Sequence, residues 1–134
     1  MNEIKAKYGG SSDIFREVCG LPINTYFSAV KMRWLLQNSV EVSSNTDDLV
    51  FGTIDTWLIA KLTGLSTFAT DSSNASRTML MDINTLEWSE KMLEAFEIKK
   101  QWLPTIVKSS SDNYGLIAGI GALDGVPITG VLGD

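Results

Sequence analysis

The side chains that could do chemistry in this chain are oxygen and amine groups, because its 134 residues include one cysteine and no histidine. Without an imidazole there is no Ser-His-Asp or Cys-His nucleophile and no His-ligated zinc or haem. The single thiol, Cys19, cannot form an intrachain disulfide, and we expect it to be a small buried residue. Carboxylate, hydroxyl, amine and backbone chemistry remain.

Tyr26 and Asp134 stand at positions in the sequence where a side chain could contact a ligand. Asp134 follows Gly133 at the end of the apolar segment 127–132, which is typical of a strand. In an open α/β sheet, ligands gather just beyond the carboxyl ends of such strands. Tyr26 stands just before a predicted helix and joins a ring that can pack to a hydroxyl that can bind a polar partner. From the residues alone, simpler interpretations stay open: a packed surface tyrosine, and a terminal acid in water.

The overall charge narrows the class of partner. The chain carries 16 acidic and 11 basic side chains, which gives a formal net charge of −5. Because nucleic acids and anionic membranes require a basic face, we expect neither as a partner, and small neutral or phosphorylated molecules fit better. No apolar run approaches the ~18 residues of a membrane span, and no secretory signal is evident. A cytoplasmic location is the default expectation.

Apolar periodicity predicts the helices that would position these residues. They are a short helix that starts at Ser11 or Ser12, one over 28–38, one that follows Phe51-Gly52-Thr53 with Gly64 as its cap, and one that starts at Asn84 or Thr85. The apolar stripe of the 28–38 helix is too broad for a surface helix, so we expect this helix to be largely buried. All four tryptophans are expected to pack in the core.

Short strands are expected between the helices. They are predicted at 67–70, 77–83, 114–118 and 128–132, with a turn at 71–74 and exposed polar segments at 5–12 and 41–48. The alternation of helices and strands predicts the α/β class. Because the chain stops where a sheet would present its ligand, we expect it to be a fragment of a longer protein.

Four segments carry a resemblance to a known family. They are Tyr26 to Asn38 (YFSAVKMRWLLQN), Phe51 to Leu58 (FGTIDTWL), Ser73 to Leu80 (SNASRTML) and Pro127 to Asp134 (PITGVLGD). In this order they resemble the FGGY carbohydrate kinases, and in particular the members that phosphorylate glycerol. Ser73 stands where many of those relatives have threonine, which is a conservative difference.

The resemblance implies a fold and a domain organisation. The fold would be the ribonuclease H-like, actin-type ATPase architecture, with residues 1–134 forming the later part of the N-terminal domain. This partial domain would lack the N-terminal phosphate-binding hairpin and the whole C-terminal domain. The glutamine that follows the catalytic aspartate in such kinases would also lie outside the chain.

The resemblance also implies roles for the two residues singled out above. Asp134 matches the catalytic base, which orients the acceptor alcohol and takes its proton as phosphoryl transfer from ATP proceeds. Tyr26 matches a tyrosine that hydrogen-bonds glycerol, and Asp134 contacts glycerol as well. Gly133 would let the backbone approach closely. ATP and Mg²⁺ are expected to be bound mainly by parts outside this chain, and the full-length enzyme is a possible homo-oligomer.

Other polar residues near the motifs are expected to be structural. Lys31 and Arg33 are interpreted as surface or ion-pair residues, and Arg77 as a structural residue. The glycines in 119–122 are a weak signal for a phosphate loop, since no suitable helix follows them. Two alternatives stay open at this point: another sugar or polyol kinase of the family, such as a pentulose kinase, or a truncated product without catalytic activity.

Overall fold

The computed structural model describes residues 2–133, and these form two compact units, which are best considered separately. The first, called here the helical unit, comprises the residues up to Phe51 together with Ser76–Trp102. The second, the sheet unit, comprises Gly52–Ala75 and the residues from Leu103 onward. Among the residues described, no helix is both long and apolar enough to cross a membrane.

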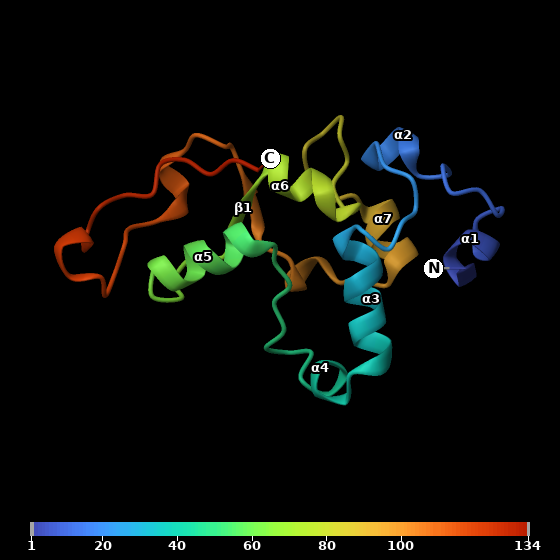
Figure 1. The fold of residues 1–134 in the computed structure, drawn as a ribbon, viewed down its shortest axis with the longest axis horizontal. Helices are drawn as coiled ribbons and strands as arrows, with labels where there is room; N and C mark the ends of the chain where they lie inside the picture. The colour runs from blue at the N-terminus through green and yellow to red at the C-terminus, as the bar shows by residue number, and fades with distance from the viewer. Residues whose placement is uncertain (1, 134) are drawn as a thin grey trace. The chain divides into compact units, whose positions relative to one another are not determined.

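The elements of each unit are labelled in Figure 1 where there is room. The helical unit contains α1 Asn2–Lys7, α2 Arg16–Cys19, α3 Ser28–Asn38, α4 Val40–Ser44, the 3₁₀ turn η1 Ser76–Thr78, α7 Glu90–Phe96 and the 3₁₀ turn η2 Lys100–Trp102. The sheet unit contains α5 Ile54–Leu62, β1 Ala69–Asp71, α6 Ser72–Ala75, β2 Thr105–Val107, and the 3₁₀ turns η3 Asp112–Tyr114 and η4 Gly121–Leu123.

The core of the helical unit forms around α7 as the apolar spacing predicted. Trp88, Met92 and Phe96 are all buried, and Phe96 packs against Phe15 with ring centroids 6.3 Å apart. The helix begins at Glu90, later than expected, because residues 82–87 form a turn instead. In that turn the Asp82 side chain accepts a hydrogen bond from the backbone N–H of Asn84, which is the local competition with helix that aspartate favours.

The prediction that α3 is largely buried was wrong. Its bounds, Ser28–Asn38, match the expected helix, but its buried side chains are Ala29 and Met32, and Trp34 is 60% exposed. A periodic apolar pattern identifies the helix but not how much of its surface finds a packing partner. Here α3 contacts α4, α7 and η1 within its unit, and these cover a narrow strip of it.

Helix α5 differs from expectation in the face that it buries. It spans Ile54–Leu62 as predicted, but Trp57 is 57% exposed, while Asp55 and Thr56 are buried. Two of the four tryptophans that were expected in the core, Trp34 and Trp57, are therefore on the surface, whereas Trp88 and Trp102 are buried. Cys19 is buried, as predicted.

The sheet unit is built on two short parallel strands. Ala69 of β1 pairs with Thr105 of β2, and Asp71 pairs with Val107. The first strand overlaps the predicted 67–70 segment, whereas β2 was not expected. Ala69 of β1 forms a small buried apolar cluster with Ile59 and Tyr114. Three partly buried side chains, Val107, Ile128 and Val131, pack against this cluster.

Several predicted strands and loops have a different conformation. Segment 77–83 contains the end of η1 and the single bridge Met81↔Trp88, and the predicted turn at 71–74 is mostly the helix α6. The predicted loop at 41–48 begins as α4, because the Ser39 side chain accepts a hydrogen bond from Val42 N–H and caps that helix. Likewise α1 occupies the first part of the predicted exposed entry, with Ile4 buried.

The last part of the chain is held by isolated bridges rather than by the two predicted strands. Antiparallel bridges join Leu116 to Pro127 and Ser110 to Gly130. Backbone hydrogen bonds continue the second contact, from Ser111 N–H to Thr129 O and from Val131 N–H to Ser109 O. Segment 128–132 is thus extended and paired, although too briefly to form a strand.

Candidate active site

Tyr26 lies in the helical unit, immediately before α3, and its side chain is 72% exposed. Its backbone N–H donates to Oδ1 of Asn24 at 2.9 Å, which fixes the turn that leads into the helix. The exposed ring and hydroxyl are consistent with a ligand-facing position. A core tyrosine would be buried, so the structure does not give Tyr26 a role in core packing.

Aromatic and cationic contacts hold the segment that carries Tyr26. The buried Phe27 ring meets the Tyr26 ring edge-on, with centroids 5.4 Å apart, and the Arg77 guanidinium lies over Phe27 at 5.2 Å. Lys31 Nζ lies 5.8 Å from the Tyr26 ring centroid. Residues from two sequence motifs, 26–38 and 73–80, therefore meet here, and the expectation that Arg77 is structural agrees with its position.

Arg33 is an ion-pair residue, as predicted. Its guanidinium donates to the Ala95 carbonyl at 3.2 Å and lies 3.3 Å from a Glu97 carboxylate oxygen. Both partners belong to α7 or its C-cap, so Arg33 ties α3 to α7.

The apolar cavity beside Tyr26 does not suit a polar ligand. It has a volume of about 330 Å³ and is lined by Thr25, Val30, Lys31, Trp34 and Leu35. A small polyol needs several hydrogen-bond donors and acceptors, and this lining offers few of them.

The sheet unit contains a buried carboxylate that organises its neighbours. Asp71, the last residue of β1, has a fully buried side chain that accepts five hydrogen bonds. The donors are Ser73 N–H at 3.0 Å, Ser73 Oγ at 2.6 Å, Asn74 N–H at 3.0 Å, Asn74 Nδ2 at 2.7 Å and Ser109 Oγ at 2.6 Å. We call these four residues the Asp71 cluster.

The cluster keeps Asp71 ionised despite its burial. Burial alone raises the pKa of this carboxyl, but the hydrogen bonds from Ser109, Ser73 and Asn74 together outweigh it and lower the pKa to about 2. A buried charge that is fully hydrogen-bonded is a rigid acceptor, since turning any donor away would leave the charge unpaired.

The Asp71 cluster also reaches the residue that precedes Asp134. Gly133 N–H donates to Ser73 Oγ at 2.7 Å. A Cβ at position 133 would lie 3.0 Å from Asn74 Oδ1, so the backbone passes close to Asn74 at this glycine. Asp134 itself lies outside the described residues. The predicted association of Tyr26 and Asp134 in one site therefore stays a prediction.

A second buried carboxylate supports the same unit. Asp55 in α5 accepts hydrogen bonds from the hydroxyl groups of Thr53 and, at 2.7 Å, Thr70. The buried Tyr114 hydroxyl donates to the Lys108 carbonyl at 3.0 Å. Its pKa is raised to about 12 by burial and by the negative charges of Asp71 and Asp55. Tyr114 is thus a neutral structural donor, not an acid-base group for catalysis near neutral pH.

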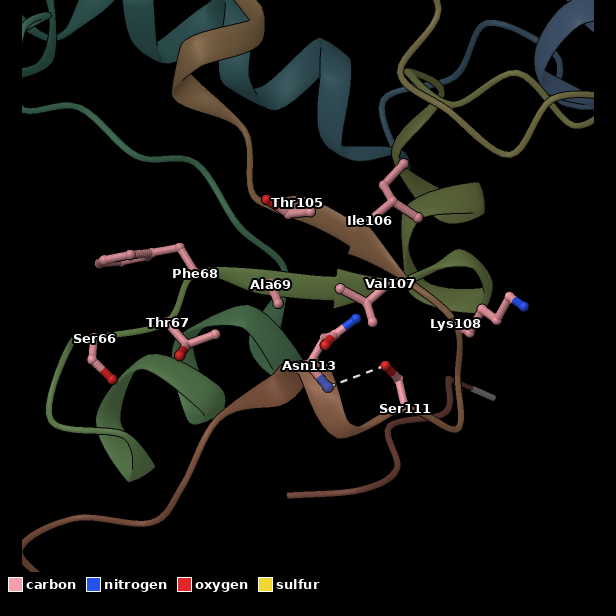
Figure 2. A pocket seen from close by; sticks show the side chains of 10 residues that line it. All are labelled: Ser66, Thr67, Phe68, Ala69, Thr105, Ile106, Val107, Lys108, Ser111 and Asn113. Atoms are coloured by element: carbon pink, nitrogen blue, oxygen red, sulfur yellow. Dashed lines mark hydrogen bonds between the residues drawn. The ribbon is translucent and has the colours of Figure 1, made fainter. Parts of the chain in front are cut away.

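A polar pocket opens beside the strand pair, and no residue that we predicted to bind substrate lines it. Its volume is about 820 Å³, and Figure 2 shows Phe68 and Lys108 at opposite ends of it. Ser111 and Asn113 lie between these ends, with Asn113 N–H donating to Ser111 Oγ at 3.1 Å. The polar part of the lining supplies hydroxyl, amide and ammonium groups, which suit a polar ligand, and Phe68, Ala69, Ile106 and Val107 supply an apolar part.

Among residues 2–133 no three His, Cys, Asp or Glu side chains are grouped so that they could hold a metal ion. The buried carboxylates of Asp55 and Asp71 accept hydrogen bonds from hydroxyl and amide donors.

The sequence did not identify Asp71 or Ser109 as important residues. It predicted a turn at 71–74, where Asp71 is in fact the last residue of β1 and the next residues form α6, and the available signal was that such residues bond their own backbone. The fifth donor, Ser109, comes from 38 residues further along the chain. That partner depends on the pairing of β1 with β2, a strand that the sequence did not predict.

This chain is similar in sequence to a family of carbohydrate kinases. The model of the FGGY family of carbohydrate kinases, N-terminal domain, matches residues 1–134. A protein of Caenorhabditis elegans named "Probable glycerol kinase" is 50% identical over 126 residues, which are 92% of this chain and 24% of that protein. The glycerol kinase of Brucella anthropi is 45% identical over 140 residues, which cover 99% of this chain and 28% of that protein.

A solved structure gives the same result in three dimensions. The crystal structure of Plasmodium falciparum glycerol kinase with ADP matches with a TM-score of 0.89 and 44% identity, and the match covers 98% of this chain and 26% of that one. This confirms the predicted ribonuclease H-like, actin-type α/β class. The chain spans about a quarter of the length of the relatives that it matches.

Proposed function

The chain belongs to the FGGY family of carbohydrate kinases, and from that premise we propose that it contributes to an enzyme that transfers the γ-phosphoryl group of ATP to glycerol. The product would be sn-glycerol 3-phosphate. The observation that carries this proposal is the match to glycerol kinases at 44–50% identity over more than nine tenths of this chain. In this proposal, residues 1–134 are part of the N-terminal domain of that enzyme.

The chemistry assigned to this chain requires only a phenol and a carboxylate. Glycerol is a neutral triol, so it is recognised by hydrogen bonds rather than by charge, and the exposed Tyr26 hydroxyl supplies one of them. Asp134 would accept a hydrogen bond from the attacking hydroxyl and then take its proton. Because the transition state of phosphoryl transfer is loose, the proton leaves late and the carboxylate acts chiefly by aiming the hydroxyl.

In this proposal, ATP is bound mainly by parts of the enzyme outside this chain. ATP would supply the phosphoryl group as the second substrate, and the residues described here offer no cluster for its Mg²⁺. The role of Tyr26 and Asp134 is to bind and orient the acceptor.

Glycerol-dependent ADP release tests the proposal. The assay compares the longest natural protein that contains this sequence with the 134-residue chain, using glycerol, D-xylulose and gluconate as acceptors. We expect the longer protein to have its highest kcat/KM with glycerol and the 134-residue chain to show no turnover. A higher kcat/KM with xylulose would favour a pentulose kinase instead, and turnover by the 134-residue chain would show that it needs no further parts.

A further inference from the structure

We propose that Ser73 is a positioning residue for the reaction: anchored by Asp71, its hydroxyl holds the Gly133 amide, the backbone group directly before the proposed base, Asp134. This inference rests on the proposed function, because it takes Asp134 to be the base. Ser73 is the first residue of the 73–80 motif, and packing alone does not require a hydroxyl there.

First, every second residue from Thr129 to Gly133 makes a hydrogen bond through its backbone. Thr129 O accepts from Ser111 N–H, and Val131 N–H donates to Ser109 O at 2.8 Å. In an extended chain, backbone groups two residues apart point to the same side. Gly133 N–H is the next donor on that side, and its acceptor is the Ser73 side chain at 2.7 Å instead of another backbone carbonyl.

The second step concerns the direction of the Ser73 hydroxyl. Its hydrogen is directed to Asp71 Oδ2 at 2.6 Å, so an oxygen lone pair is left to accept from Gly133 N–H. The Ser73 backbone N–H donates to the same carboxylate oxygen at 3.0 Å. Two bonds to one buried charge fix the serine, so the acceptor that Gly133 meets is already in place.

The third step concerns the space around Gly133. A Cβ there would meet Asn74 Oδ1 at 3.0 Å and Ser73 Oγ at 3.2 Å. Asn74 cannot easily move away, because its Nδ2 donates to Asp71 Oδ1 at 2.7 Å. The Gly133 backbone is therefore confined by Ser73 and Asn74 directly before the proposed base.

This arrangement predicts an effect on turnover that exceeds the effect on folding. Errors of about 1 Å in the placement of a reacting group can reduce a rate by ~10²-fold. We expect Ser73→Ala to lower kcat roughly tenfold and to leave KM for ATP within about twofold, because the change affects the aim of the carboxylate. Ser73→Thr keeps the hydroxyl, so it should retain most of kcat.

The variant Ser109→Ala is a matched control that distinguishes a structural role of Ser73 from a positioning role. Ser109 also donates its hydroxyl to Asp71 Oδ2 at 2.6 Å, but its side chain does not contact Gly133 in any hydrogen bond of the described residues. Ser109→Ala removes an equivalent bond to the same charge. If Ser73 positions the backbone before Asp134, Ser73→Ala should lower kcat by more than its loss of Tm accounts for, whereas Ser109→Ala should lower the Tm and leave kcat close to that of the parent protein.

The experiment measures kcat, both KM values and Tm for these variants in the longest natural protein, with Asp134→Asn assayed first. In parallel, hydrogen exchange of the Gly133 amide is followed by NMR in the 134-residue chain. Faster exchange in Ser73→Ala but not in Ser109→Ala, together with the selective loss of kcat, would support the proposal.

Two contrary results have different meanings. If Asp134→Asn is inactive but Ser73→Ala and Ser109→Ala lose equal activity in proportion to their Tm, the positioning role is overturned and the proposed function stands. If Asp134→Asn keeps its turnover, the proposed function fails, and the inference fails with it.

Discussion

Tyr26 and Gly133, one in each unit, are held by different kinds of interaction. The Tyr26 segment depends on ring contacts with Phe27 and on cations above the rings, and its side chain is exposed. Gly133 is held by a hydroxyl that is itself fixed to the buried charge of Asp71. Contacts of the first kind are soft and additive, whereas a buried charge network responds strongly to the loss of one member.

The difference matches the tasks proposed for the two regions. A residue that recognises a small polyol needs an accessible hydroxyl and tolerates small shifts of its ring. A backbone that carries a reacting carboxylate must keep it within a fraction of an ångström of the productive position. Under the proposed function, the buried charge of Asp71 lies where precise positioning is required.

Removing the buried charge of Asp71 should have the largest effect on stability among the changes considered for the two regions. Asp71→Asn replaces an acceptor of five hydrogen bonds by an amide whose NH₂ faces donors, so we expect the unfolding free energy to fall by roughly 2–4 kcal/mol. Urea denaturation of the 134-residue chain measures this. The matched control is Asp82→Asn in the helical unit, where the aspartate accepts bonds from Asn84 near the surface and the loss should be clearly smaller. Equal losses would contradict the distinction between the two regions.

The pH dependence of stability provides a second, smaller effect. The pKa of Asp71 is lowered in the folded state to about 2 from 3.8. A lowered folded-state pKa stabilises the fold above the unfolded value, and that contribution is lost as the pH falls towards 2. We expect the unfolding free energy to decrease by about 2 kcal/mol from this group between pH 5 and 2. The decrease should be smaller in Asp71→Asn, and an identical decrease in both proteins would exclude Asp71 as its source.

The smallest expected effect is at Tyr26. Tyr26→Phe keeps the ring contacts with Phe27 and Lys31 and removes one neutral hydrogen-bonding group. Loss of such a group costs about 0.5–1.5 kcal/mol, so KM for glycerol should rise roughly two- to tenfold with little change in Tm. Steady-state kinetics in the longest natural protein test this. An unchanged KM for glycerol would argue against Tyr26 as a substrate ligand.

The features that the sequence predicted well depend on local patterns. The bounds of α3 and α5 and the buried face of α7, with Trp88, Met92 and Phe96, follow from apolar spacing. The four motifs identified the family that the comparisons confirm. Local spacing was sufficient in these cases because each element and each motif lies within a short stretch of residues.

The features that it missed depend on distant partners. The exposure of Trp34 and Trp57 is decided by which elements cover their helices, and apolar spacing does not contain that information. The Asp71 cluster requires Ser109, which the pairing of β1 and β2 brings close. Asp71 was therefore visible as a turn residue, but its role as a buried acceptor was not.

The most direct test of the central claim is the turnover of Asp134→Asn in the longest natural protein that contains this sequence. If the carboxylate after Gly133 is the base, kcat for glycerol phosphorylation should fall roughly 10²- to 10⁴-fold, since an amide cannot accept the proton. The Tm should be nearly unchanged, because the five described hydrogen bonds to Asp71 come from Ser73, Asn74 and Ser109. A kcat within about threefold of the parent protein would contradict the claim.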